Sequence, residues 1–114
     1  VKIENSTIDG KVKIDFSDKN NEVEIINSTI RGPVIIGKGS KIKNSYIGPF
    51  TSIYHNCYIE NSELEHSIVL ENVKIVGVKR ITDSLFGNNV ELLETDKKPK
   101  AIRVMIGDSS RIEL

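Results

Sequence analysis

The chain has few of the residues on which many protein classes depend. Its 114 residues include one cysteine, one methionine, no tryptophan and only 5% aromatic side chains. The single cysteine, Cys57, excludes an internal disulfide and fits a reducing cytosol. The longest apolar runs are three residues, as at 34–36 and 68–70, so no segment is long enough to span a bilayer.

An excess of charge of either sign is also missing. Lysine plus arginine and aspartate plus glutamate are both 16, which gives a formal net charge of zero. Nucleic acids and anionic membranes normally require a basic excess, so neither is an expected partner. The basic cluster at 97–103 follows directly on acidic residues and is interpreted as a solvated loop. The first residues form no charged segment followed by an apolar core, so we expect no secretory signal and a cytoplasmic location.

What the chain does have is an internal repeat. The dipeptide Asn-Ser recurs at Asn27, Asn44 and Asn61, which are 17 residues apart. An aliphatic residue stands two positions before each of these asparagines, and another stands three positions after it. Between these units the aliphatic residues are spaced by six, so the period of 17 divides into five, six and six. Neither an amphipathic helix nor an alternating strand repeats in this way.

Spacings of five and six indicate a coil with three short strands per turn, each strand pointing one large aliphatic residue inward. The expected interior residues, turn by turn, are Ile3, Ile8 and Ile14; Ile25, Ile30 and Ile36; Ile42, Ile47 and Ile53; Ile59, Leu64 and Val69; and Ile75, Ile81 and Phe86. The residue four positions after an interior residue should face inward at a corner, where only modest bulk fits. Those residues are Val12, Val34, Ser40, Thr51, Cys57, Val73 and Val90. The sequence therefore predicts an all-β parallel β-helix of about five triangular coils over residues 1–91.

Three irregularities modify this pattern. About five extra residues within 15–22 predict a protruding loop after the first turn. Lys79 occupies a place that should face inward, so a bulge or shift is expected at 76–80, and the register of 69–80 is the least defined. Residues 92–114 are expected to form a loop and capping strands that cover the open sheet edge, since Ile106 and Ile112 resume the spacing of six. Because the first repeat begins at Val1 without a methionine, we expect a domain cut from a longer protein.

Periodicity alone leaves the handedness open, since most crossovers between parallel strands are right-handed. The hexapeptides at 36–41 (Ile-Gly-Lys-Gly-Ser-Lys) and 47–52 (Ile-Gly-Pro-Phe-Thr-Ser) resemble those of left-handed β-helix proteins. Longer stretches at 31–37, 44–53, 63–70, 80–87 and 106–114 resemble, in this order, the C-terminal extension of long-form glucose-1-phosphate thymidylyltransferases. The resemblance covers nearly the whole chain and implies a left-handed β-helix.

The same resemblance implies a parent enzyme that joins a nucleoside triphosphate to a sugar 1-phosphate with Mg²⁺ and releases pyrophosphate. In that family the chemistry belongs to an N-terminal nucleotide-binding domain with a glycine-rich phosphate loop. The present sequence contains no counterpart of that loop, so no catalytic residue is carried over and no cofactor is expected in this chain. The implied function is a structural and oligomerising domain that contacts the catalytic domain of the same chain.

An acyltransferase module is the alternative, since many left-handed β-helix proteins transfer acyl groups from CoA with a histidine as general base. The candidates are His55 and His66, with His66 preferred because Glu65 adjoins it. Both are expected to point outward on different faces, and a solvent-facing histidine at a bend is the simpler interpretation of each. Cys57 is interpreted as a packed thiol, and one cysteine with two separated histidines predicts no metal site.

The aromatic residues suggest a contact surface. Phe50 and Tyr54 should face outward, Tyr58 should lie at a bend, and Ile35 should lie beside them as a further outward apolar residue. Such a patch predicts docking onto a second subunit or the N-terminal domain, so the chain is expected not to be a monomer. Isolated surface aromatics are the alternative. The repeated asparagines are expected to form a structural ladder at one corner.

Overall fold

The computed structural model describes residues 1–15 and 17–94, together with the backbone of strand Ile102–Met105. Its strands form three sheets, named A, B and C, that make the sides of a triangular coil. Sheet A contains β1 (Lys2–Glu4), β4 (Glu24–Ile26), β7 (Lys41–Lys43), β10 (Tyr58–Glu60), β13 (Lys74–Val76), β16 (Glu91–Glu94) and β17 (Ile102–Met105). Sheet B contains β2 (Thr7–Asp9), β5 (Thr29–Arg31), β8 (Tyr46–Ile47), β11 (Glu63–Glu65) and β14 (Ile81–Thr82). Sheet C contains β3 (Val12–Ile14), β6 (Val34–Ile36), β9 (Thr51–Ile53), β12 (Ile68–Val69) and β15 (Leu85–Phe86).

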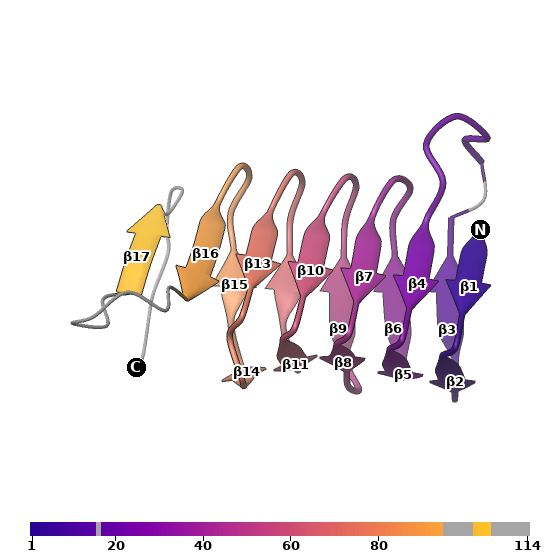
Figure 1. Cartoon of the computed structure of the whole chain (residues 1–114), viewed down its shortest axis with the longest axis horizontal. Coiled ribbons are helices and arrows are strands. Elements are labelled where there is room, and N and C mark those ends of the chain that lie inside the picture. The colour runs from indigo at the N-terminus through magenta and orange to yellow at the C-terminus, as the bar shows by residue number, and fades with distance from the viewer. Residues whose placement is uncertain (16, 95–101, 106–114) are drawn as a thin grey trace.

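The chain winds as a left-handed parallel β-helix, which confirms the predicted fold. Within the coils, from β1 to β16, strands of the same sheet pair in parallel from one coil to the next, for example β4 with β7 and β7 with β10. Figure 1 shows the chain descending along the near face in sheet A and ascending along the far face in sheet C, while it advances from right to left. That path defines a left-handed coil.

The predicted interior residues stack in register from coil to coil. In sheet A, Ile25, Ile42, Ile59 and Ile75 pair in succession and all are fully buried. Equivalent columns run through sheets B and C and merge into a single core. Burying an aliphatic side chain of this size stabilises the fold by about 1.5–3 kcal/mol. The smaller inward residues at the corners are also buried in the second to fifth coils, as predicted.

The first coil is the least buried part of the predicted core. Ile3 stands in the sheet A column by register, opposite Ile25, but it is 46% exposed. Ile8, Val12 and Ile14 are only partly buried against the core. The cause is geometric, because β1, β2 and β3 are edge strands with a neighbour on one side only.

The predicted irregularities are present. The described residues at 17–23, before β4, form a protruding loop. The Asn21 side chain of this loop donates a hydrogen bond to the Asn56 side chain at 2.6 Å. In the fifth coil, Ile81 follows Ile75 at an interval of six positions, whereas the matching interval in the preceding coils is five. The extra residue lies at the corner, where Lys79 is exposed and Val78 packs against the core instead. The uncertain register of 69–80 is resolved by the pairing of Val69 with Phe86.

At the C-terminal end, β17 pairs antiparallel with β16 and closes the last edge of sheet A. This pairing is the observed part of the predicted cap. Ile106 and Ile112, which the spacing also assigns to the cap, lie outside the described residues, as do residues 97–101 of the basic cluster. The interpretation of that cluster as a loop is wrong at Arg103, which belongs to β17 and pairs with Leu93.

Because the interior columns are stacked and buried, a polar substitution at an inward position should cost much more stability than one at an outward position. We predict that Ile47→Asp lowers the free energy of unfolding by several kcal/mol, because the buried carboxylate has no partner. Lys43→Asp on the outside should cost about 1 kcal/mol or less, mainly by losing the contact of Lys43 with the Tyr58 ring at 5.7 Å. Thermal unfolding followed by circular dichroism measures both. Equal melting temperatures would contradict the register.

Candidate interaction surface

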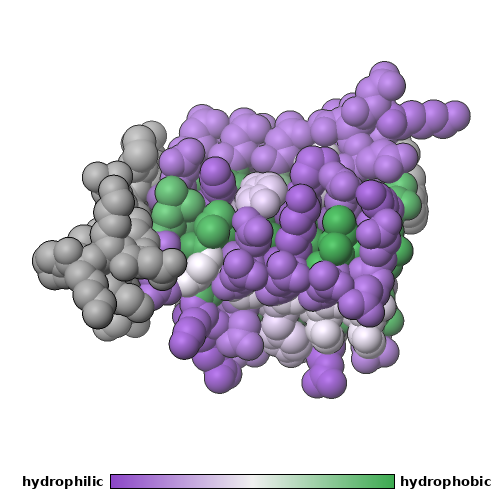
Figure 2. All heavy atoms as spheres, viewed as in Figure 1, coloured by the Kyte–Doolittle hydropathy of each residue, from purple (hydrophilic) through white to green (hydrophobic). Residues whose placement is uncertain are grey.

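The three sheets present different chemistry to solvent. On sheet A the outward residues are mostly charged, and Lys41 forms an ion pair with Glu24 of the preceding coil at 2.6 Å. This hydrogen bond from Lys41 is the main cause that lowers the pKa of Glu24. The near face in Figure 2, which carries sheet A, is accordingly covered largely by hydrophilic side chains.

Sheet C differs because its outward column is almost without charge. The register places Lys13, Ile35, Ser52, Ile68 and Leu85 in one line across its five strands. We call this line the sheet C stripe. Its three aliphatic members are 45–52% exposed. Phe50 and Tyr54, exposed by 65% and 45%, lie on the same coil as Ser52, one at each end of β9. Exposed large apolar residues of the described chain therefore gather on this face, apart from Val1 and Ile3 at the N-terminal end.

The structure regroups the aromatic patch that the sequence suggested. Ile35, Phe50 and Tyr54 belong to the sheet C face, as the spacing indicated. Tyr58 does not: it lies in β10 of sheet A rather than at a bend, because it directly precedes the interior residue Ile59. Sequence reasoning also missed Ile68 and Leu85. Each directly precedes the interior residue of its sheet C strand, as Ile35 does, and that signal identifies all three.

Tyr58 is engaged in polar contacts on sheet A. Its hydroxyl donates a hydrogen bond to a Glu60 carboxylate oxygen at 2.9 Å, and the ammonium groups of Lys43 and Lys74 lie 5.7 and 5.9 Å from its ring centre. Desolvation, followed by the hydrogen bond and charge of Glu60, raises the pKa of Tyr58. Tyr58 therefore contacts charged side chains of sheet A and is not part of the apolar surface of sheet C.

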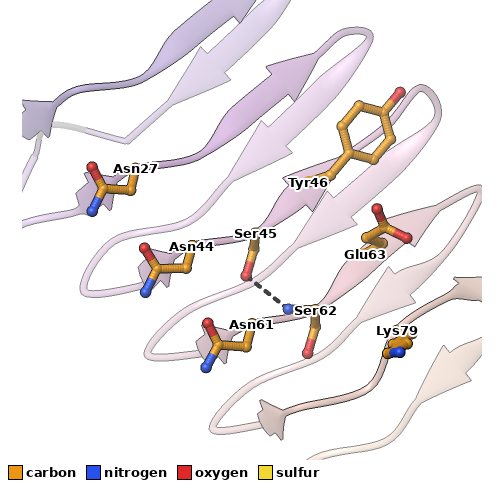
Figure 3. Close-up of a pocket in the computed structure, with 8 residues that line it drawn as sticks. All are labelled: Asn27, Asn44, Ser45, Tyr46, Asn61, Ser62, Glu63 and Lys79. Atoms are coloured by element: carbon orange, nitrogen blue, oxygen red, sulfur yellow. Dashed lines mark hydrogen bonds between the residues drawn. The ribbon is translucent and has the colours of Figure 1, made fainter.

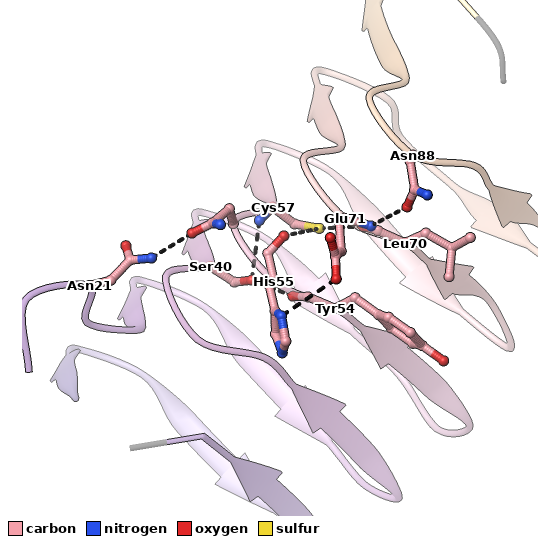
Figure 4. A network of polar contacts seen from close by, with 9 residues as sticks. Asn21, Ser40, Tyr54, His55, Cys57, Leu70, Glu71 and Asn88 are labelled. Carbon is pink, nitrogen blue, oxygen red and sulfur yellow. Dashed lines mark hydrogen bonds and ion pairs between the residues drawn. The ribbon is translucent and has the colours of Figure 1, made fainter. Parts of the chain in front are cut away.

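The two histidines lie at different corners of the coil. His66 follows sheet B, and its ring packs against that of Phe50 with centroids 5.2 Å apart. Its neighbour Glu65 pairs with Arg80 at 3.0 Å. His55 follows sheet C, and its Nδ1 lies 3.6 Å from a carboxylate oxygen of Glu71 in the next coil (Figure 4). The carboxylate beside His66 in the sequence, that of Glu65, therefore pairs with Arg80, whereas His55 lies near the carboxylate of Glu71.

Cys57 is a packed thiol, as predicted. It is 1% exposed, and its Sγ lies 2.8 Å from the carbonyl oxygen of Leu70. Its backbone N–H donates to the Ser40 hydroxyl in the preceding coil (Figure 4). Burial raises the pKa of the Cys57 thiol, so the reactive thiolate is disfavoured.

The Asn-Ser units build a double ladder at the corner between sheets A and B. Asn27, Asn44 and Asn61 adopt left-handed backbone angles, with φ of 49–50°, that asparagine tolerates better than most residues. Beneath them, the hydroxyl of each serine donates to the carbonyl two residues back. The hydroxyls of Ser28 and Ser45 accept the backbone N–H of the serine one coil further on, and the Ser62 hydroxyl accepts that of Val78. The dashed contact from Ser62 to Ser45 in Figure 3 is one such step, 3.2 Å long. The serines satisfy buried backbone groups at a corner where the strand ladder is interrupted.

A groove of about 450 Å³ follows this corner between Asn27 and Lys79, and Tyr46 and Glu63 form part of its wall (Figure 3). The asparagine side chains that line it are exposed. In the described part of the chain, no group of three or more His, Cys, Asp or Glu residues could hold a metal ion. Within the same residues, no helix has the length and hydrophobicity to cross a membrane.

The geometry defines a left-handed β-helix of the hexapeptide-repeat type, and one of its faces, on sheet C, is almost without charge. Its sequence is 45% identical over 91 residues to a glucose-1-phosphate thymidylyltransferase from Streptomyces griseus, covering 80% of this chain and 26% of that protein. It is 49% identical over 90 residues to the glucose-1-phosphate thymidylyltransferase of Streptomyces antibioticus, covering 79% and 25%. The matched part is the C-terminal quarter of these enzymes, which confirms the resemblance drawn from the sequence.

Two further likenesses are weaker. A low-salt glycan biosynthesis nucleotidyltransferase from Haloferax volcanii is 32% identical over 71 residues, which are 61% of this chain and 20% of that protein. A hexapeptide transferase family protein from Anaplasma phagocytophilum is 17% identical, with a TM-score of 0.33 over 90% of this chain and 80% of its own, and this likeness supports no conclusion about function. No protein-family model matches the chain.

The serine ladder yields a test of the corner geometry. We predict that Ser45→Ala lowers the free energy of unfolding by about 1–3 kcal/mol, because the buried N–H of Ser62 loses its acceptor. The matched control is Ser84→Ala. Ser84 is only partly buried and donates to the carbonyl of Thr82 in the fifth coil, so about 0.5–1 kcal/mol is expected. Urea unfolding of both variants gives the values, and a neutral Ser45→Ala would contradict a structural role for the ladder.

Proposed function

We propose that this chain is the non-catalytic, oligomerising C-terminal domain of a sugar nucleotidyltransferase. The parent reaction joins a nucleoside triphosphate to a sugar 1-phosphate and releases pyrophosphate, as in a glucose-1-phosphate thymidylyltransferase. One observation carries the proposal: identity of 45–49% to two enzymes of that name, confined to about a quarter of their length. The chain therefore spans much less than two thirds of the relatives it matches.

The parent chemistry sets requirements that support this division of labour. Transfer of a nucleotidyl group requires donors that stabilise the phosphate charge and carboxylates that hold Mg²⁺. In the proposal these groups belong to an N-terminal nucleotidyltransferase domain of the same chain, and the parent enzyme is cytoplasmic. The β-helix supplies a rigid body, fixed by its stacked core, with a face available for contacts between subunits.

A hexapeptide-type acyltransferase module is the second candidate, and one contact favours it. His55 lies 3.6 Å from the carboxylate of Glu71, and a carboxylate beside a histidine can stabilise its protonated form during general base catalysis. Against this, both side chains are about half exposed to solvent. An acyl donor such as acetyl-CoA, acting on an amino sugar phosphate, would have to bind along the adjacent face of the coil.

Calorimetry on the purified 114-residue chain separates the two candidates. We predict no detectable heat with either deoxythymidine triphosphate plus Mg²⁺ or acetyl-CoA, because neither the reaction site nor a donor site belongs to this domain. A parent protein that contains the proposed N-terminal nucleotidyltransferase domain should bind the triphosphate. Micromolar binding of acetyl-CoA that is lost in His55→Ala and kept in the control His66→Ala would reject the proposal in favour of the acyltransferase.

A further inference from the structure

The sheet C face carries a residue that the fold alone does not favour. Phe50 stands at the corner before β9 with φ of 61°, a left-handed conformation. The equivalent corner residues in the next two coils are His66 and Asp83, and the latter type accepts this conformation more readily. Phe50 is nevertheless 65% exposed, so its ring gains little from its own core. A large aromatic held at an unfavourable and exposed position indicates a contact outside the chain.

The apolar residues around Ser52 have an approximate two-fold arrangement. Ile35 and Ile68 lie one coil before and one coil after Ser52 in the sheet C stripe. Phe50 and Tyr54 lie two residues before and two residues after it along the chain. In a symmetric interface between two identical chains each contact occurs twice, so a two-fold axis at Ser52 would bring Ile35 of each chain onto Ile68 of the other.

Charges at the edges of sheet C select the relative direction of the two chains. Lys11 and Lys13 lie in the first coil, whereas Asp83 and Leu85 hold the matching places in the fifth coil. At the other corner, Lys38 stands in the second coil and Glu71 in the fourth, one coil before and after His55. If the chains ran in the same direction, the two-fold axis would follow the sheet C stripe, and Lys13 would meet its own copy. With the chains running in opposite directions, Lys11 faces Asp83, Lys38 faces Glu71, and Lys13 lies over Leu85.

We propose that the sheet C face binds a second copy of this chain in an antiparallel dimer, with the two-fold axis passing along β9 at Ser52. Ile35 of one copy then packs on Ile68 of the other, and Phe50 and Tyr54 each meet their own copies at the ends of the axis. This inference rests on the proposed oligomerising function and specifies the surface that performs it. Five strands spaced by about 4.8 Å make a face about 20 Å long, which is small for a stable interface. The isolated dimer is therefore expected to dissociate on dilution.

Chemical cross-linking tests this geometry. Packed sheets lie about 10 Å apart, which exceeds the reach of a disulfide, so a short bis-maleimide is the suitable reagent. We expect a mixture of Ile35→Cys and differently tagged Ile68→Cys to give several-fold more cross-linked dimer than either variant alone. Ser52→Cys should cross-link with itself, and Lys43→Cys on sheet A should not. The native chain is the blank, because Cys57 is buried.

A charge exchange provides an independent readout by sedimentation equilibrium. Lys38→Glu places two acidic residues opposite each other and should weaken dimerisation several-fold, whereas adding Glu71→Lys should restore it. Circular dichroism verifies that each variant is folded.

Each remaining outcome is decisive. Cross-linking of Ile35→Cys with itself in preference to Ile68→Cys means parallel chains and rejects the proposed geometry. A dimer or larger oligomer without cross-linking on sheet C rejects this surface but leaves the oligomerising function in place. A chain that stays monomeric at every concentration rejects both, and sheet C would then be assigned to the catalytic domain of the parent protein.

Discussion

The structure depends on one constraint: every strand must place a single large aliphatic residue directly beneath its counterpart in the next coil. Ile25, Ile42, Ile59 and Ile75 meet this condition in sheet A, with full burial of each. The narrow interior has no room for a second large side chain per strand, so the corners take small inward residues such as Ser40 and Cys57. Their hydroxyl and thiol groups then bond to backbone atoms of neighbouring coils. The register that stacks the aliphatic residues therefore also places the corner hydroxyl and thiol groups within hydrogen-bonding distance of the backbone.

The register also determines the surface. Once inward residues stack, the outward residues between them stack too, and each face acquires a uniform chemistry along the coil. Sheet A gathers charges, while sheet C gathers Ile35, Ile68 and Leu85 around Ser52. A solenoid of this kind has contacts only between neighbouring coils, so its faces can vary without disturbing the core. This separation is consistent with a domain whose proposed role is to hold subunits together while the chemistry takes place elsewhere in the parent protein.

The sequence predicted what depends on spacing within the chain. Positions of the interior columns, the loop after β3 and the irregular corner at Lys79 all follow from intervals of five and six. Features that join different coils were harder to predict, because they require alignment across 16 or 17 residues. The serine ladder, the pairing of His55 with Glu71 and the separation of Tyr58 from Phe50 belong to this group. The motif Asn-Ser itself was recognised, but its serine was not assigned a role, since the burial of a hydroxyl between two coils is not visible in a local pattern.

The most direct measurement of the central constraint compares single-residue insertions that differ only in place. A glycine inserted after Asn20 lengthens the loop between β3 and β4, where no residue stacks with the next coil. A glycine inserted after Ser52, within β9, moves Ile53 and every later interior residue out of register with the coils before it. Residue-resolved amide hydrogen exchange should show unchanged protection of the strands for the loop insertion and lost protection of β9 to β15 for the strand insertion. Equal protection in the two variants would contradict the account.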